Sequence, residues 1–194
     1  MSGISHTDSP PRVSSASNSV KITLTINGPR YALIIDTRTT LLDLLRERLD
    51  LSGTQKGCDH GLCGACTVSV DEERVVSCHT LAASVSESKV LTVEGLSEGD
   101  DLSDLQQAFL EHDAFQCGYC TPGQISSAHA MLREHARGDL SMVSYEGTRG
   151  EVVNGRMELS EHEIRERMAG NICRCGAYAN IVAAVRAVSQ RGQL

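Results

Sequence analysis

Aromatic residues are scarce in this chain of 194 residues, since they make up 3% of it and tryptophan is absent. Its cores must therefore be built from aliphatic side chains, without the large rings that usually dominate burial. Small domains of this kind gain stability from bound metal. Long hydrophobic runs are missing too, because no segment approaches the roughly 20 apolar residues of a membrane span. We therefore expect no membrane partner.

The chain also lacks an excess of positive charge. Its formal net charge is −7 with every cysteine counted as neutral. Phosphate groups attract lysine and arginine, so an acidic chain is a poor candidate for binding nucleic acid. Its charge favours basic surfaces of other proteins instead. We expect no nucleic-acid partner.

Several motifs of catalysis and cofactor binding are absent from the sequence. No G-x-G-x-x-G follows a strand, no G-x-x-x-x-G-K-[ST] occurs, and there is no G-x-S-x-G. The chain therefore does not bind a flavin or NAD through those folds, and it does not carry out acyl transfer. We expect no catalytic residue on this chain and a function that depends on chemistry elsewhere.

Cysteine is the residue that stands out, because the eight cysteines form two groups of four with none left over. The first group is Cys58, Cys63, Cys66 and Cys78. Its spacing, C-x4-C-x2-C-x11-C, is the plant-type arrangement for a [2Fe–2S] cluster. We expect Gly57, Gly61 and Gly64 to take positive φ, so that the loop curls and aims its N–H groups inward.

Other uses of the first group are less favoured. A structural zinc site also takes four cysteines, but usually as two short pairs, whereas here three lie on one loop. Disulfides need a secreted context that nothing in the sequence supports. His60 and His79 flank the cysteines, and we expect them to be polar loop residues because four thiolates suffice.

The second group is ambiguous by spacing alone. Its members are Cys117, Cys120, Cys173 and Cys175, a C-x2-C pair and a distant C-x-C pair. Zinc, a redox dithiol and a cluster all remain open. A helix predicted to begin at Thr121 would point its positive end toward Cys117 and Cys120, which suits thiolates. Arg174 would either raise a cluster potential or form a surface ion pair.

Hydrophobic periodicity divides the chain into two domains preceded by a tail. Residues 1–19 are rich in serine and proline, with no apolar signal segment and no twin-arginine pair, so we expect a disordered tail and a cytoplasmic protein. Residues 20–96 read as a small α+β domain. Its expected elements are strands at 20–27, 31–35, 67–70, 74–77 and 90–93, and a helix at 41–49 capped by Thr40.

Residues 102–190 read as an all-α domain that holds the second cysteine group. The expected helices cover 103–113, 121–137, 160–170 and 180–190. Ser103 with Gln106, Thr121 before Pro122, and Ser160 with Glu163 resemble helix starts, and Gly138 resembles a helix end. Residues 138–158 show no clear period, which indicates either a functional or partner-ordered segment or a tolerated surface insertion.

Three segments carry a resemblance to a known family: GCDHGLCGACTV, FQCGYCTPGQI and GNICRCGAY. They resemble the iron–sulfur subunit of the xanthine oxidase family of molybdenum hydroxylases, over about residues 20–189. The resemblance implies a β-grasp, plant-type ferredoxin-like domain, then a four-helix bundle with a pseudo-twofold axis. Each domain would hold one [2Fe–2S] cluster, with all eight cysteines as ligands.

Two further segments, DTRTTLLDLLRERL and SEHEIRERMAGNICRCGAYANI, most resemble the small subunit of bacterial periplasmic-type aldehyde oxidoreductases. Those enzymes are heterotrimers with a large molybdenum-binding subunit and a medium FAD-binding subunit. Their small subunits carry a twin-arginine leader, and this chain begins without one. We therefore expect either a cytoplasmic enzyme or a leader that has been removed.

The resemblance also implies a direction of electron flow. Electrons would pass from molybdopterin, as its cytosine dinucleotide, through the Cys117 group and then the Cys58 group to FAD. Gln116 and the backbone of Cys175 match pterin contacts, and the less favoured alternative for Gln116 is an exposed glutamine on the surface of the helix bundle. The alternatives are a small subunit of an N-heterocycle, purine or CO hydroxylase, and a stand-alone ferredoxin or zinc-binding module.

Overall fold

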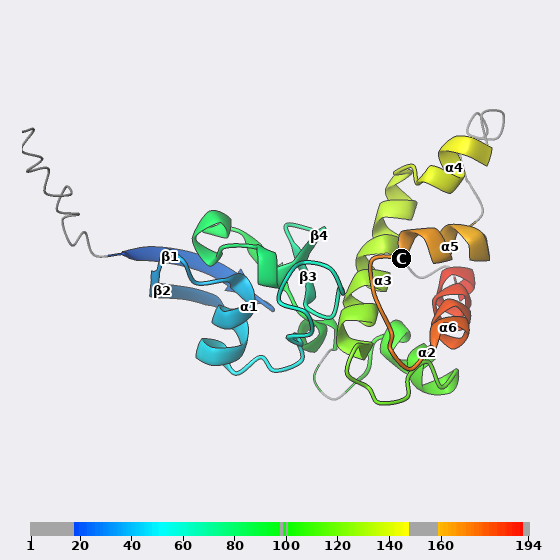
Figure 1. Cartoon of the computed structure of the whole chain (residues 1–194), viewed down its shortest axis with the longest axis horizontal. Helices are drawn as coiled ribbons and strands as arrows, with labels where there is room; N and C mark the ends of the chain where they lie inside the picture. The colour runs from blue at the N-terminus through cyan, green and yellow to red at the C-terminus, as the bar shows by residue number, and fades with distance from the viewer. Residues whose placement is uncertain (1–17, 98, 100, 148–158, 192–194) are drawn as a thin grey trace, which may run out of the picture.

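The computed structural model describes residues 18–97, 99, 101–147 and 159–191. A β-sheet with its own short helix lies at one end of the molecule and a group of helices at the other (Figure 1). Most of the predicted tail, residues 1–17, lies outside the described residues. The first strand already includes Ser19, so the boundary predicted after residue 19 falls inside it.

The first half of the chain forms a mixed five-stranded sheet in the order β2-β1-β5-β3-β4. Strand β1 pairs with β2 as a hairpin and with β5 in parallel, and β3 is antiparallel to both β4 and β5. The strands are β1 Ser19–Ile26, β2 Arg30–Asp36, β3 Thr67–Val70, β4 Glu73–Val76 and β5 Lys89–Leu91. Alternation in β1 turns Ile22, Leu24 and Ile26 inward, where they pack with leucines of the helix that crosses the sheet.

That helix begins at Leu41 and changes type after one turn. Helix α1 covers Leu41–Asp43 and continues as a π-helix, η1, over Leu44–Arg48. Thr40 caps it as predicted, because its hydroxyl accepts a bond from the Asp43 N–H. Three 3₁₀ turns complete this half: η2 Ser77–His79, η3 Ala82–Val85 and η4 Val93–Leu96.

The last strand of the sheet is placed differently from the prediction of 90–93. Strand β5 ends at Leu91 because β1 has already ended at Ile26 and Asn27 turns away with φ +51°. The Asn27 side chain accepts a bond from the Thr92 N–H and donates one to the Thr92 hydroxyl. The chain therefore leaves the sheet at Thr92 and enters η4.

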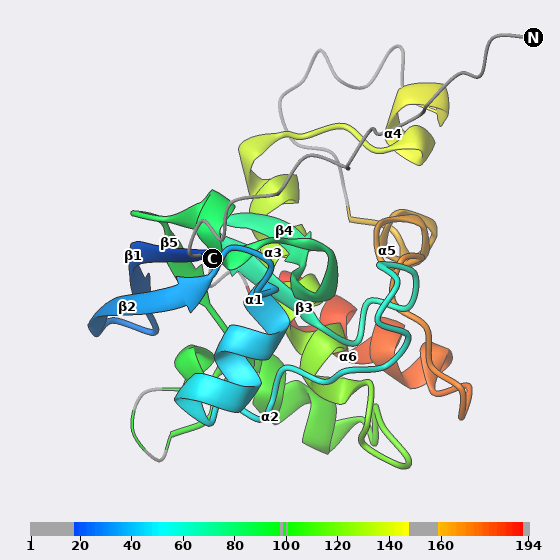
Figure 2. The same cartoon turned by 60° about the vertical axis from the view of Figure 1, so that its left-hand side comes forward.

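The second half is helical. Its helices are α2 Asp104–Glu111, α3 Thr121–Arg137, α4 Met142–Gly147, α5 Glu161–Arg167 and α6 Tyr178–Arg191. Helices α2, α3, α5 and α6 share one core, to which they contribute Phe109, Met131, Ile164 and Val185 respectively. Helix α3 lies between the sheet and the other helices, and the turned view shows β3 and β4 beside it (Figures 1 and 2). Within the described residues, none of the helices is long and apolar enough to cross a bilayer.

The predicted helix ends are right in part. Ser103 and Gln106 form a capping box, Ser160 caps α5, and Gly138 ends α3 in the left-handed conformation. The prediction that Thr121 is an N-cap is wrong. Cys120 occupies that position, Thr121 is the first residue of α3, and its hydroxyl has no hydrogen-bond partner.

Two segments of the helical half also differ from expectation. Helix α5 ends at Arg167 rather than near residue 170, because the chain turns at Met168 and the Asn171 N–H bonds back to the Met168 carbonyl. The segment 138–158, which has no clear period in the sequence, contains α4 in its described part. Residues 148–158 lie outside the described residues.

Ion pairs join the β3–β4 hairpin to α3. Arg74 of β4 donates through Nε and Nη2 to both carboxylate oxygens of Glu134, at 2.7 and 2.8 Å. Its Nη1 also donates to the Ser127 hydroxyl and to the Arg167 carbonyl. Bidentate arginine–carboxylate pairs are among the stronger polar contacts in proteins. Arg74 therefore fastens the sheet to the helical half.

Replacing Arg74 with methionine should destabilise the protein. Removing one partner of a fully buried pair costs about 3–5 kcal/mol, and we expect about 2 kcal/mol here because Arg74 is partly exposed and Arg167 stays near Glu134. Urea unfolding of the full chain, followed by circular dichroism, measures the change. The matched control is Arg30→Met, which breaks the exposed pair with Glu87 and should change stability by less than about 0.5 kcal/mol. Equal losses in the two variants would contradict the fastening role of Arg74.

Candidate metal centres

The first cysteine group is assembled by a loop and a hairpin. Cys58 and Cys63 lie on the loop between η1 and β3, Cys66 stands just before β3, and Cys78 lies in η2 just after β4. Because β3 and β4 form a hairpin, Cys66 before β3 and Cys78 after β4 lie side by side, and the Cys78 N–H approaches Cys66 Sγ at 3.5 Å. Cys66 and Cys78 are buried against Leu42, whereas Cys58 and Cys63 are half-buried.

Backbone N–H groups point at the sulfurs of this group. The N–H groups of His60 and Leu62 both donate to Cys58 Sγ, each at 3.3 Å. The Gly61 N–H donates to Cys78 Sγ and the Cys58 N–H to Cys63 Sγ, again at 3.3 Å. Amide donors of this kind stabilise negative charge on sulfur. The donor set therefore fits an anionic iron–sulfur cluster held by thiolates.

The glycines of the loop act in two different ways. Gly61 and Gly64 have φ of +74° and +71°, as predicted, and Asp59 also takes a left-handed conformation. The prediction for Gly57 is wrong, because its φ is not positive. Gly57 is required for space instead, since a Cβ at that position would lie 2.7 Å from Cys63 Sγ.

The surroundings of the thiols shift their pKa values in opposite directions. Hydrogen bonds from the His60 and Leu62 N–H groups lower the pKa of Cys58 to about 6. Burial raises the pKa of Cys78 to about 11. The outer sulfur thus ionises readily, while the buried one needs a positive partner to become a thiolate.

The second cysteine group comes from two loops of the helical half. Cys117 and Cys120 precede α3, and Cys173 and Cys175 lie between α5 and α6. The Cys120 and Cys173 thiols are hydrogen-bonded, and burial raises the pKa of Cys120 to about 12. The Ala177 N–H donates to Cys173 Sγ at 3.4 Å. Cys120 stands at the start of α3, so the positive end of that helix faces it, as predicted.

Exposure separates the members of this second group. Cys173 is buried, whereas Cys117 and Cys175 are exposed. Gly118 and Gly176, each beside one of the exposed cysteines, have left-handed φ of +80° and +79°, which lets both loops turn sharply. The group thus opens to the molecular surface on the side of Cys117 and Cys175.

Four other residues singled out in the sequence are exposed: Gln116, Arg174, His60 and His79. Gln116 lies on the surface next to Cys117, a position that suits both of its predicted roles. Within the described ranges, no group of three or more His, Cys, Asp or Glu residues is arranged around a single metal ion, whereas a [2Fe–2S] cluster divides its four thiolates between two irons. The assignment of the eight cysteines as cluster ligands, and of Gln116 and Cys175 as pterin contacts, stays a prediction.

The loops of the two cysteine groups touch each other, a contact that no sequence pattern predicted. The Ile172 N–H donates to the Cys63 carbonyl at 2.9 Å, and the Tyr119 hydroxyl donates to the Lys56 carbonyl at 2.7 Å. Asn171 is buried between the same loops. The one sequence signal for these residues is that Tyr119, Asn171 and Ile172 lie within two positions of a cysteine.

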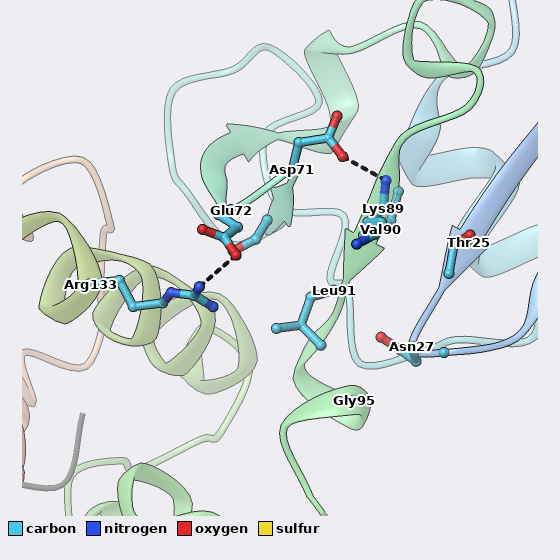
Figure 3. Close-up of a pocket in the computed structure, with 11 residues that line it drawn as sticks. Thr25, Asn27, Asp71, Glu72, Lys89, Val90, Leu91, Gly95 and Arg133 are labelled. Atoms are coloured by element: carbon cyan, nitrogen blue, oxygen red, sulfur yellow. Dashed lines mark hydrogen bonds and ion pairs between the residues drawn. The ribbon is translucent and has the colours of Figure 1, made fainter. Parts of the chain in front are cut away.

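A separate pocket of about 500 Å³ lies between the sheet and α3 (Figure 3). Its walls include Asn27 after β1, Leu91 of β5 and Arg133 of α3. Arg133 is paired there with Glu72 at 2.7 Å, and the Asp71 carboxylate accepts a bond from the Lys89 N–H. No cysteine lines this pocket, so it is distinct from both cysteine groups.

Comparison with known proteins assigns both halves of the chain. Residues 24–114 match the family described as "2Fe-2S iron-sulfur cluster binding domain", and residues 92–186 match the "[2Fe-2S] binding domain" family. The aldehyde oxidoreductase iron-sulfur-binding subunit PaoA of Escherichia coli K12 is 51% identical over 90% of this chain and 74% of its own length. The nicotine 6-hydroxylase small subunit of Paenarthrobacter nicotinovorans is 40% identical over 88% and 90%.

Solved structures show the same fold. Quinoline 2-oxidoreductase from Pseudomonas putida 86 matches with a TM-score of 0.75 and 36% identity, over 92% of this chain and 100% of the matched one. Aldehyde oxidoreductase from Desulfovibrio gigas matches with a TM-score of 0.73 and 31% identity, over 88% of this chain. The match spans 17% of the Desulfovibrio chain, so this chain corresponds to one part of that larger protein.

Replacing Gly57 with alanine should prevent the first cysteine group from binding its metal. The added Cβ would stand 2.7 Å from Cys63 Sγ, and a sulfur fixed by a metal has no room to move. We expect the variant to retain about half of the wild-type iron, because one of two four-cysteine sites remains intact. Iron analysis of the purified protein measures this. Gly170→Ala is the control, since a Cβ there meets nothing within 4 Å. Wild-type iron in Gly57→Ala, or an equal loss of iron in the control, would contradict the prediction.

Proposed function

The chain belongs to the iron–sulfur subunits of the xanthine oxidase family of molybdenum hydroxylases, and we propose that it serves an aldehyde-oxidising member of that family. The family membership confirms the resemblance seen in the sequence. It makes the chain an iron–sulfur protein with an electron-transfer role inside an oxidoreductase complex. The observation that carries the aldehyde assignment is the 51% identity to the aldehyde oxidoreductase subunit PaoA. The direct contact between the two cysteine loops, through Ile172 and Cys63, supports the electron-transfer role.

The proposed substrate class rests on the relatives. The PaoA subunit, whose enzyme is named an aldehyde oxidoreductase, has a higher sequence identity to this chain than the nicotine 6-hydroxylase small subunit and the caffeine dehydrogenase subunit gamma. A hydroxylase of N-heterocycles is the second candidate, favoured by the structural match to quinoline 2-oxidoreductase. The large subunit that accompanies the chain would decide between the two, because the sequence predicts no catalytic residue on this chain.

The chain's own residues would hold the clusters and keep them anionic. Four thiolates in each group would bind one [2Fe–2S] cluster, which supplies a one-electron relay between molybdopterin in a large subunit and FAD in a medium subunit. The N–H groups of His60, Gly61 and Leu62 would stabilise negative charge at the first group. Burial of Cys66 and Cys78 keeps water from the inner side of the first cysteine group.

The proposed partners would meet the chain at opposite ends of the relay. The exposed face at Cys117 and Cys175 suits the approach of the pterin, and Gln116 on that face offers an amide to hydrogen-bond it. Large apolar side chains are exposed beside the cysteines of both groups, as expected of surfaces that partners cover. They are Leu62, Phe115, Tyr119, Ile172 and Tyr178.

We also propose that the helical half is a four-helix bundle with a pseudo-twofold axis. The shared core of α2, α3, α5 and α6 supports this arrangement. So does the placement of the second cysteine group, which enters at the start of α3 and just before α6. Among the described side chains of helix α4, none belongs to that core.

Metal analysis tests the proposal against a zinc-binding module. A chain with two [2Fe–2S] clusters contains about four iron atoms and about four acid-labile sulfides. Reduction should produce two distinguishable paramagnetic signals, because the two cysteine groups have different surroundings. Zinc without sulfide would rule out an electron-transfer role. A single signal from fully loaded protein would contradict two dissimilar sites.

Two serine substitutions test the order of electron flow in the assembled enzyme. Cys173→Ser should remove the second cluster and leave the first one assembled but no longer reducible by the aldehyde substrate. Cys78→Ser should remove the first cluster and leave the second one reducible, with electrons unable to reach FAD. Freeze-quench electron paramagnetic resonance follows each cluster. Reduction of the first cluster by substrate in the Cys173→Ser enzyme would reverse the proposed order.

A further inference from the structure

We propose that Asn171 is a positioning residue that holds the two cysteine groups in register for electron transfer between their clusters. The inference rests on the proposed function, because it presupposes that electrons pass from one group to the other. Asn171 itself contacts no cysteine side chain among its described hydrogen bonds. It acts through the backbone on either side of it.

The Asn171 side chain joins the two halves of the protein. Its Nδ2 donates to the Gly64 carbonyl at 2.9 Å, in the loop of the first cysteine group. The same nitrogen donates to the Gly123 carbonyl at 3.1 Å, in the first turn of α3. A primary amide has two N–H donors, so one can serve each half. The residue is 6% exposed, and water does not compete for these bonds.

The neighbours of Asn171 and Gly64 form the link between the cysteine groups. Cys63 precedes Gly64, and Ile172 follows Asn171. The Ile172 N–H donates to the Cys63 carbonyl at 2.9 Å, and Ile172 is covalently joined to Cys173. A continuous path of covalent bonds and one hydrogen bond therefore connects Cys63 Sγ to Cys173 Sγ. Electron tunnelling weakens steeply with distance and is more effective along bonded paths than across open gaps.

Close backbone packing leaves little freedom around this link. A Cβ on Gly64 would lie 2.7 Å from Asn171 Nδ2, and a Cβ on Gly123 would lie 2.5 Å from the Gly64 carbonyl oxygen. Gln124 of α3 adds a bond from its Nε2 to the Asn171 carbonyl at 2.9 Å. The loop, the start of α3 and the segment before Cys173 thus meet with Asn171 at their centre.

The Arg74–Glu134 pair provides a contrast, because it also joins the two halves but touches neither cysteine loop. Its loss would loosen the attachment of β4 to α3 while leaving the bonds of Asn171 in place. If Asn171 has a positioning role, the two residues should affect stability alike and electron transfer differently. This difference separates a role in positioning from one in stability alone.

The test uses the assembled enzyme with Asn171→Leu and Asn171→Ser. Leucine has a similar size and no donor, and serine keeps one donor that is too short to reach both carbonyls. Both variants should retain two clusters by iron and spin quantitation. After a pulse of photoreduced deazaflavin, electrons should equilibrate more slowly between the two clusters than in the wild type, and the spin–spin splitting of the fully reduced clusters should change. Hydrogen exchange at the Ile172 N–H should become about tenfold faster, as expected when a buried hydrogen bond loses its support.

The control variant is Arg74→Met, which should keep the wild-type splitting and equilibration rate. Wild-type splitting and rate in the Asn171 variants would overturn the proposal, as would equal changes in the Arg74 variant. If neither Asn171 variant assembles both clusters, Asn171 serves assembly rather than positioning, and the proposal is again wrong. Wild-type enzyme that contains fewer than two clusters would instead contradict the proposed function, so the two failures are distinguishable.

Discussion

The direct contact between the two cysteine loops is the constraint on which the arrangement of the molecule depends. Cys63 and Cys173 belong to different halves, and the bond between the Cys63 carbonyl and the Ile172 N–H places their segments side by side. For the segments to meet there, glycines must stand at Gly64 and Gly123, where a methyl group would collide. Asn171 must also point its amide between them. The requirements of one contact thus explain several residues that neither cysteine group would need alone.

Polar interactions hold the same two halves together at a second place, with a different physical character. Near the cysteines the bonds are neutral and engage the backbone, and those of Asn171 are buried. At the β3–β4 hairpin the contacts are ion pairs, in which Arg74, Arg133 and Arg137 meet carboxylates across the interface. Exposed pairs contribute little to stability, whereas the partly buried pair of Arg74 contributes more. Attachment and alignment of the two halves therefore rest on separate sets of residues.

Several features were predictable from local sequence because short-range physics determines them. The spacing of Cys58, Cys63 and Cys66 identifies the kind of site, and the Ser103–Gln106 capping box forms as its residues predict. Other predictions failed where neighbouring structure intervened. Thr121 is the first residue of α3 because Cys120 takes the N-cap position. The last strand ends before Thr92 because the Thr92 N–H donates to the Asn27 side chain instead of to a neighbouring strand. Gly57 proved necessary for space around a sulfur rather than for its backbone conformation.

The sequence by itself determined the two domain types, the eight cysteines and their grouping, and the family to which the chain belongs. Those features depend on residue types and on spacings along one loop or helix, which local rules describe. The tertiary structure alone decided how the two groups face each other, because Gly64 and Asn171 lie far apart in the chain and no periodicity relates them. It also decided which cysteines are exposed, since burial depends on what the other half of the protein covers. The path between the groups is therefore a property of the folded chain.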